Sequence, residues 1–279
     1  GLSSSSALSC GVALALLTVN GHNVDRVKLA EVMAEAEQYT GTRGGGMDQA
    51  VILCAQGRSA LGVSFAPLQI REAEVPKDWV FLVIYSGVVA EKSGVAQATY
   101  NARTRECRAA LQTMWAEVGK GIPPERDYRP LLKAANPEHL LSIGRRVLRV
   151  PLLPRFRHTI SEALRVSDAE KALRMRDIDT FGHIMNISHE SLRDDYEVST
   201  PELDRIVMLA QQAGAAGAKL TGAGFGGAAL ILCAKDKERA IRKSLAHGYY
   251  GPQGTTLSED GIFSVIPSGG ATVALAVGG

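Results

Sequence analysis

The chain has almost no net charge, no closely spaced cysteines and no apolar run long enough to cross a membrane. Its 31 lysine and arginine residues nearly balance 29 aspartate and glutamate residues over 279 positions, which leaves a net charge of +2. This balance gives no electrostatic reason to expect nucleic acid or a membrane surface as a partner. The four cysteines are scattered along the chain, a pattern typical of reduced thiols in a cytoplasmic protein rather than of disulfides or zinc ligands.

The most apolar stretch, residues 7–19, has no charged residue before it, and the first charge is Asp25. A secretory leader carries positive charge ahead of its apolar part, and a membrane helix needs about 20 apolar residues. The stretch therefore predicts a helix that is buried on most sides. The chain also has no Walker sequence and no GxGxxG after a first strand, so neither common nucleotide-binding fold is supported.

Helical and strand-like segments intermix without a regular βαβ period, which predicts an α+β fold. The strand-like segment 80–85 is almost wholly apolar and is expected at the centre of a sheet. Residues 121–157 are rich in Pro and Arg, and we expect them to form an excursion between domains. The expected helices are 6–19, 24–38, 47–54, 97–118, 161–175, 177–191, 201–214 and 235–247. The expected strands are 60–66, 80–85 and 228–234, followed by a strand-forming tail over 261–277.

Four consecutive serines stand at the start of the first expected helix, after Gly1 and Leu2. The free amides and partial positive charge of a helix N-terminus suit a phosphate, and serine hydroxyls can bind phosphate oxygens or join a Mg²⁺ shell. A serine-rich helix cap or a flexible terminus is the commoner meaning of such a run. Alone, this motif does not decide between them.

Two further segments carry candidate chemistry. In the first, from Glu37 to Gln49, three glycines precede Asp48, which lies near a helix start where an ionised carboxylate is favoured and could orient or deprotonate a hydroxyl. In the second, Lys219 to Gly227, four glycines permit close backbone approach to a ligand. The alternatives are a helix cap at Asp48, a solvated helix face at Glu37 and a tight turn in the glycine segment.

Together these motifs resemble the GHMP kinase superfamily and, within it, the galactokinases. GLSSSSAL resembles the ATP phosphate loop, GGGMDQ the sugar-site segment with the catalytic aspartate, and KLTGAGFGGAA the third motif of the family. TYNARTREC and MNISHESLRDDYEVSTPELD are also similar to galactokinase sequence. The GGGMDQ form and the four serines are closest to the eukaryotic-type branch, which includes N-acetylgalactosamine kinase and plant galactokinase.

The resemblance implies the two-domain GHMP kinase fold. Residues 1–85 would be the remainder of an N-terminal domain of the ribosomal-S5-domain-2-like type, and residues 86–279 a ferredoxin-like C-terminal domain with a helical excursion. The family's first motif, which carries an Arg that pairs with the catalytic aspartate and a Glu-His-Asp group for sugar hydroxyls, does not occur in these residues. We therefore expect an N-terminally truncated member, with Arg43 as a candidate neighbour of Asp48.

Residue roles follow from the resemblance, position by position. Asp48 is the implied catalytic residue, and His158 and His189 are expected to be surface or satisfied core histidines without a catalytic role. The implied ATP-binding residues are Gly1, Leu2, Ser3, Ser4, Ser5 and Ser6; the sugar-binding ones are Gly45, Gly46, Asp48 and Tyr100; the Mg²⁺-associated ones are Ser5 and Glu37; the supporting glycine loop comprises Gly222, Gly224, Gly226 and Gly227.

The implied reaction is transfer of the γ-phosphoryl group of ATP, with Mg²⁺, to the C1 hydroxyl of galactose by a cytoplasmic, monomeric enzyme. N-acetylgalactosamine is the nearest competing substrate, and Tyr100 favours galactose because the N-acetylgalactosamine kinase pattern has Phe at this place. Two hypotheses of a different class are a non-catalytic sensor of galactose and ATP and an inactive fragment. The intact serine loop and Asp48 favour an enzyme.

Overall fold

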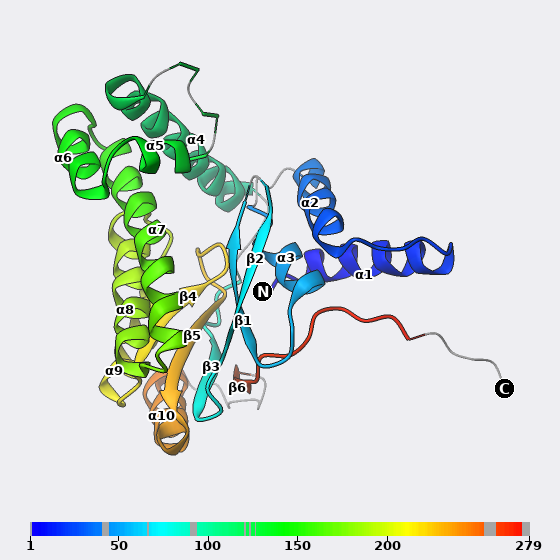
Figure 1. The fold of residues 1–279 in the computed structure, drawn as a ribbon. Helices are drawn as coiled ribbons and strands as arrows, with labels where there is room; N and C mark the ends of the chain where they lie inside the picture. The colour runs from blue at the N-terminus through cyan, green and yellow to red at the C-terminus, as the bar shows by residue number, and fades with distance from the viewer. Residues whose placement is uncertain are drawn as a thin grey trace. The chain divides into compact units, whose positions relative to one another are not determined.

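The computed structural model describes residues 2–40, 45–65, 67–89, 94–119, 121–122, 124–125, 127–253 and 261–274. It divides the chain into two compact units (Figure 1). Unit 1 comprises Gly1–Lys77 with Ile266–Gly279, and unit 2 comprises Asp78–Val265. No helix among the described residues is long and apolar enough to span a membrane.

Unit 1 contains helices α1 (Ser4–Val19), α2 (Arg26–Glu37) and α3 (Met47–Cys54) and the strands β1 (Ser59–Ser64) and β2 (Gln69–Glu74). Asp25 fixes the start of α2, since its side chain accepts hydrogen bonds from the amides of Val27 and Lys28. The helices bury a small shared core whose members are Cys10, Leu14, Leu29, Ala30, Ala50, Leu53 and Leu68.

The chain returns to unit 1 after residue 265. Gly270 donates to the carbonyl of Ala55 at 2.8 Å, and the guanidinium of Arg26 donates to the carbonyl of Ala271 at 2.6 Å. These bonds hold residues 266–271 against the end of α3. The tail 261–277 was expected to form a strand, but only Ile262–Val265, strand β6, does so among its described residues.

Helix α1 is not buried on most sides, contrary to the expectation from its composition. Cys10 and Leu14 are buried, whereas Leu8 and Val19 are 71% and 68% exposed. The helix is apolar around its whole circumference but has partners on only one side within unit 1, so apolar composition alone did not predict its burial.

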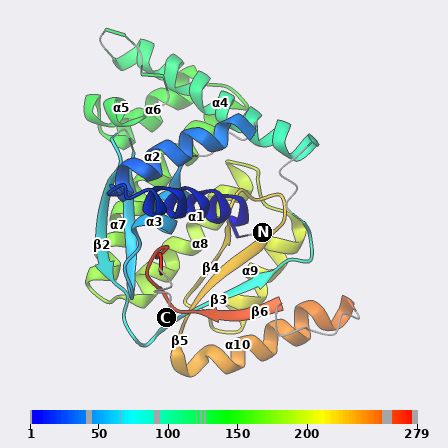
Figure 2. The ribbon, with the colours of Figure 1, turned by 90° about the vertical axis from the view of Figure 1, so that its right-hand side faces the viewer.

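Unit 2 is built on a four-stranded antiparallel sheet of β3 (Trp79–Tyr85), β4 (Gly217–Thr221), β5 (Ala228–Ala234) and β6. The strand order is β4-β5-β3-β6 (Figure 2). A helical segment joins β3 to β4, and another helix joins β5 to β6, which gives the ferredoxin-like βαββαβ arrangement. The α+β class and the central position of β3 are thus confirmed.

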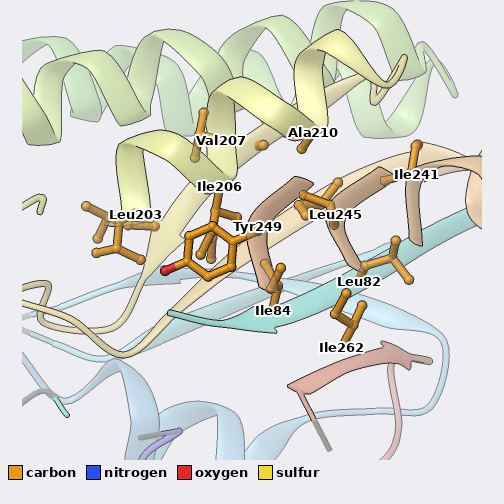
Figure 3. Packing of buried hydrophobic residues seen from close by; sticks show 14 of the residues in the cluster. Leu82, Ile84, Leu203, Ile206, Val207, Ala210, Ile241, Leu245, Tyr249 and Ile262 are labelled. Atoms are coloured by element: carbon orange, nitrogen blue, oxygen red, sulfur yellow. The ribbon is translucent and has the colours of Figure 1, made fainter. Parts of the chain in front are cut away.

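The main core of unit 2 lies between this sheet and helices α9 (Pro201–Gln212) and α10 (Glu238–Leu245). Side chains from both helices face Leu82 and Ile84 of β3, which are fully buried (Figure 3). Tyr249, in the helical turns that follow α10, adds its ring to this core and donates its hydroxyl to the carbonyl of Ser86 at 2.6 Å.

The remaining helices of unit 2 form the segment between β3 and α9. They are α4 (Gly94–Val118), α5 (Arg129–Ala134), α6 (Pro137–Val147), α7 (Leu152–Arg174) and α8 (Ile178–Asp194). Residues 121–157, expected to be an excursion between domains, lie within unit 2, and α5, α6 and the start of α7 occupy most of them. Asn136 caps α6 and Pro137 follows at its first position, where proline is well tolerated.

The boundary between the units falls at Lys77, whereas the sequence analysis placed a domain boundary at residue 85. The difference is strand β3. Its backbone pairs with β5 and β6, so it belongs to the sheet of unit 2.

Candidate functional site

The start of α1 meets the start of α3 in unit 1. Ser3, the residue before α1, donates its hydroxyl to Oδ2 of Asp48 at 2.5 Å. Asp48 lies half-buried in the first turn of α3. Ser3 has a left-handed backbone, with φ 60° and ψ 36°, which is uncommon for a residue other than glycine. A short hydrogen bond therefore links the serine run to the candidate catalytic carboxylate.

The end of α2 completes this arrangement. The carboxylate of Glu37 accepts hydrogen bonds from Ser5 at 3.0 Å and from Ser6 at 3.1 Å, and Gln49 also donates to it. Ser6 and Gln49 are buried, while Ser5 is exposed. Three helix ends thus bring the serine run, Glu37 and Asp48 close together, with two sets of hydrogen bonds between them.

The amides at the start of α1 are not used by a side-chain cap, and the first turn contains no acidic residue. Such a helix end offers free N–H donors and a partial positive charge to an anion. Ser4 and Leu2 are exposed at this end of the helix. The local chemistry suits a phosphate group beside a carboxylate and serine hydroxyls.

Gly46 is the residue directly before α3, and its backbone conformation sets the direction in which the chain enters the helix. It has φ +86°, and an added Cβ would lie 2.9 Å from the Cβ of Ala34, so both its conformation and its surroundings require glycine. Gly45 differs, because an added Cβ there would meet none of the described residues within 4 Å. Packing therefore explains Gly46 and leaves open space beside Gly45.

The glycine segment of unit 2 forms the turn between β4 and β5, and Gly222, Gly224, Gly226 and Gly227 all have positive φ. A Cβ on Gly224 would overlap the carbonyl oxygen of Val198, and one on Gly226 would lie 2.8 Å from that of Val88. Gly224 and Gly226 are therefore required because the backbone at Val198 and Val88 lies too close to leave room for a side chain. At Gly222, an added Cβ would meet no atom within 4 Å among the residues that the structure describes.

Tyr100 lies half-buried in α4, and its carbonyl accepts a hydrogen bond from Thr104. It belongs to unit 2 with the glycine segment, whereas the serines, Glu37 and Asp48 belong to unit 1. The assignment of both groups to one site stays a prediction. Gly1 and Arg43 lie outside the described residues.

His158 and His189 are satisfied core histidines, as expected. His158 pairs with the hydroxyl of Ser191 at 2.9 Å and stacks on Tyr196, and burial lowers its pKa to about 4. His189 accepts a bond from the amide of Leu220 at Nδ1, so its Nε2 carries the hydrogen toward Asp204 at 3.1 Å.

The sequence analysis missed two members of the network in unit 1. Gln49 was taken only as the end of a motif, and Ser3 was assigned to ATP rather than to Asp48. A signal for Gln49 existed, because a polar residue next to Asp48 on a short apolar helix is expected to need a buried partner. Ser3 offered none, because its contact depends on an unusual backbone conformation.

The sequence of the chain is similar to those of known kinases. The family model described as GHMP kinases N terminal domain matches residues 1–56, and the one described as GHMP kinases C terminal matches residues 169–251. A galactokinase of Roseiflexus sp. (strain RS-1) is 36% identical over 258 residues, which cover 92% of this chain and 63% of that protein. One from Chloroflexus aurantiacus is 35% identical, with 89% and 61% covered.

Solved structures agree with these sequence matches. Galactokinase of Lactococcus lactis, solved with galactose, is 30% identical and superposes with a TM-score of 0.82, covering 96% of this chain and 66% of that one. Mevalonate kinase of L. major is 20% identical and superposes with a TM-score of 0.58, covering 95% of this chain and 66% of that one. This likeness shows the fold alone. The chain spans about 63% of the length of its Roseiflexus relative.

Proposed function

Because the chain belongs to the GHMP kinase superfamily, we propose that it acts as a galactokinase, transferring the γ-phosphoryl group of ATP to the C1 hydroxyl of galactose. The observation that carries the proposal is the hydrogen bond between Ser3 and Asp48, which joins a phosphate-type helix start to a carboxylate. A phosphoryl-transfer enzyme needs this adjacency, since the attacking hydroxyl must be held in line with the phosphate.

The serine loop, residues 1–6, binds the phosphates of ATP in this proposal. The uncapped amides of α1 and the exposed hydroxyl of Ser4 supply donors, and the absence of an acidic residue from the first turn of α1 avoids repulsion. Leu2, half exposed beside them, covers one side of the bound nucleotide. Phosphoryl transfer requires little more than such positioning and neutralisation of charge.

Asp48 orients the attacking hydroxyl of the sugar and accepts its proton. Its carboxylate lies in the first turn of α3, where it can accept a hydrogen bond from a substrate hydroxyl. Gly45 and Gly46 line the same pocket for the sugar, and the open space at Gly45 is consistent with a bound molecule there.

The residues present fit Mg²⁺, which this family of reactions implies. Glu37 offers a carboxylate and Ser5 a hydroxyl 3.0 Å from it, and hard oxygen donors of this kind suit Mg²⁺, which keeps water and substrate phosphate in its remaining positions. The metal supplies neutralisation of charge on the phosphates when bound. Ser6 and Gln49 hold the Glu37 carboxylate in place for it.

Galactose is preferred to N-acetylgalactosamine because Tyr100 stands where the N-acetylgalactosamine kinase pattern has Phe. The glycine loop, Gly222 to Gly227, supports the same reaction. We further propose a monomeric, cytoplasmic enzyme. The competing hypotheses are an N-acetylgalactosamine kinase, a non-catalytic sensor and a fragment without activity.

One set of measurements separates these hypotheses. The chain is incubated with Mg·ATP and either sugar, and the sugar phosphate is followed by phosphorus NMR, with calorimetric titration of galactose and a non-hydrolysable ATP analogue alongside. We expect galactose 1-phosphate and little N-acetylgalactosamine product. Binding of both ligands without turnover would identify a sensor, and binding of neither would contradict the proposal.

The variant Asp48→Asn supplies the matching test of the site. It keeps the size of the side chain and removes the acceptor charge, so turnover should nearly vanish while the ATP analogue still binds. Wild-type turnover in this variant would remove Asp48 from its proposed role.

A further inference from the structure

Arg155, near the start of α7, is the largest fully buried side chain of unit 2, at 1% exposure. Each nitrogen of its guanidinium has its own acceptor. Nε donates to Glu106 of α4 at 2.7 Å, NH2 donates to Glu197 at 2.7 Å, and NH1 donates to the carbonyl oxygen of Asp195. The planar fork of arginine spreads its donors over three nitrogens and so reaches three separated acceptors, whereas the three donors of an ammonium group share one nitrogen.

Two of these acceptors belong to one short segment, residues 195–198, which follows α8. The segment has a second cationic partner, since Arg103 donates to the carbonyl of Tyr196 at 2.9 Å and to Glu197 at 3.2 Å. Glu197 itself has φ 56°, a conformation that costs free energy for a side chain of its size. The arginines therefore hold the segment in a shape that its own backbone does not favour.

The other side of this segment supports the glycine loop. The carbonyl oxygen of Val198 accepts a hydrogen bond from the amide of Phe225 at 2.7 Å, and it also lies where a Cβ of Gly224 would stand. Phe225 has φ 59°, so the loop too is held in an unfavourable conformation by its surroundings. Contacts thus run from Arg155 through residues 195–198 to the centre of the loop.

We propose that Arg155 is a positioning residue for phosphoryl transfer, which fixes the glycine loop through the segment 195–198. The inference depends on the proposed function, in which this loop supports the catalytic centre. A buried ion network contributes little net stability compared with well-packed apolar side chains. Its advantage here is geometric, because it sets the direction of the Val198 carbonyl.

The test uses the full chain with two variants, Arg155→Lys and Glu197→Gln. Lysine keeps the charge but carries its donors on a single nitrogen, so it cannot reproduce all three bonds of the guanidinium. Glu197 is half exposed, so its replacement does not threaten folding. The first measurement is hydrogen exchange at the Phe225 amide, which reports on the loop without any assay of activity. We expect exchange roughly tenfold faster in both variants, the effect of losing one charged hydrogen bond.

The second measurement is the kinetics of galactose phosphorylation. We expect kcat to fall roughly tenfold with the KM for galactose unchanged, because a displaced support lowers transition-state stabilisation and not sugar binding. The control is Leu140→Ala, which removes a fully buried side chain of α6 and lowers stability by another route. It should change neither the exchange of Phe225 relative to its neighbours nor kcat.

The outcomes separate the inference from the proposed function. Unchanged exchange of Phe225 in both variants, or an equal change in Leu140→Ala, overturns the role of Arg155. Faster exchange with unchanged kcat also overturns it, because the loop would then move without effect on transfer. If the wild-type chain transfers no phosphate, the proposed function fails, and the exchange measurement still decides whether Arg155 holds the loop.

Discussion

The hydroxyl of Ser3 donates to the carboxylate of Asp48 at 2.5 Å across 45 positions of sequence. The contact depends on the left-handed backbone of Ser3, which turns its side chain toward α3. One serine of the loop therefore serves the carboxylate and leaves the helix amides uncapped. The structure thus distinguishes two roles within the serine run, which the sequence motif does not: Ser3 contacts Asp48, and the amides at the start of α1 remain without a side-chain cap.

Replacing Ser3 tests this division. Ser3→Gly suits the backbone conformation and removes the hydroxyl, so we expect kcat to fall roughly tenfold, the effect of one lost hydrogen bond to a charged group, without loss of stability. Ser3→Ala should lose the same activity and also about 1 kcal/mol of stability, because alanine is unfavourable at positive φ. Kinetics and thermal melts measure both.

The control for this pair is Ser9→Ala, on the same helix, where the hydroxyl donates to the carbonyl of Ser6. Its kcat should match that of the wild type. Equal activity of Ser3→Gly and the wild type would show that Asp48 needs no partner in the serine loop.

Glu37→Gln tests the proposed metal site. The change keeps the hydrogen-bonding size of the side chain but removes its charge beside Ser5, so the Mg²⁺ concentration for half-maximal activity should rise by roughly tenfold or more. Glu35→Gln is the matched control, because Glu35 is exposed on the same helix. An equal Mg²⁺ dependence in the two variants would move the metal away from Glu37.

The sequence predicted best where a boundary has a local chemical cause. Helix α3 has the expected bounds, 47–54, because glycines precede it and its apolar run is short. Strand β5 also has its expected bounds, 228–234, since a glycine turn precedes it and its residues are almost all apolar. In both cases the signal lies in the element and in the residues directly before it.

Elements whose stability depends on partners outside their own residues were missed. Strand β2 has one buried residue, Ala73, and forms because its backbone pairs with β1, so its pattern resembles polar surface. Strand β4 is five residues long and was assigned to the glycine loop, although its amide at Leu220 bonds to His189. The helices within 121–157 likewise gain their stability from packing against α4 and α7.

The same limit applies to the site. Local sequence predicts that Ser5, Glu37 and Asp48 carry the chemistry, but the role of Gln49 and the link from Ser3 arise from tertiary contacts. Arg155 gave no local signal either, because an arginine at a helix start is usually solvent-facing. Its three acceptors come from two segments, α4 and residues 195–198.

The buried His158 predicts a pH dependence of stability. Its pKa falls from 6.5 to about 4, chiefly because burial penalises the charged form. The unfolded chain therefore binds a proton between these values and the folded chain does not, so stability is full above pH 6.5 and is lost as pH falls toward 4. The loss is on the order of 1–3 kcal/mol.

Urea unfolding at about pH 7.5 and about pH 5, on either side of the ordinary histidine pKa, measures this loss. His158→Gln, which retains a partner for Ser191, should lose much of the pH dependence, while His189, whose pKa burial also lowers, still contributes the remainder. If the free energy of unfolding depends on pH equally in the variant and the wild type, His158 has the same pKa in the folded and unfolded chain, and this prediction is wrong.

Substitutions at the glycines of the loop test whether each glycine is required by packing or by a bound ligand. Gly224→Ala should cost about 3 kcal/mol or more, because the new Cβ overlaps the Val198 carbonyl in addition to the unfavourable φ of +80°. Gly214→Ala is the control for conformation alone, with φ +89° and nothing within 4 Å, and should cost about 1 kcal/mol. Urea unfolding measures the difference, and equal costs would mean that Val198 yields to the added atom.

Gly222 shares the positive φ but has open space around it. Gly222→Ala should therefore cost no more stability than Gly214→Ala, since neither added Cβ meets another atom. If a ligand occupies the space beside Gly222, Gly222→Ala also loses turnover, whereas Gly214→Ala does not. Wild-type kcat in Gly222→Ala would assign the whole loop to packing, because Gly224 and Gly226 are already explained by the backbones of Val198 and Val88.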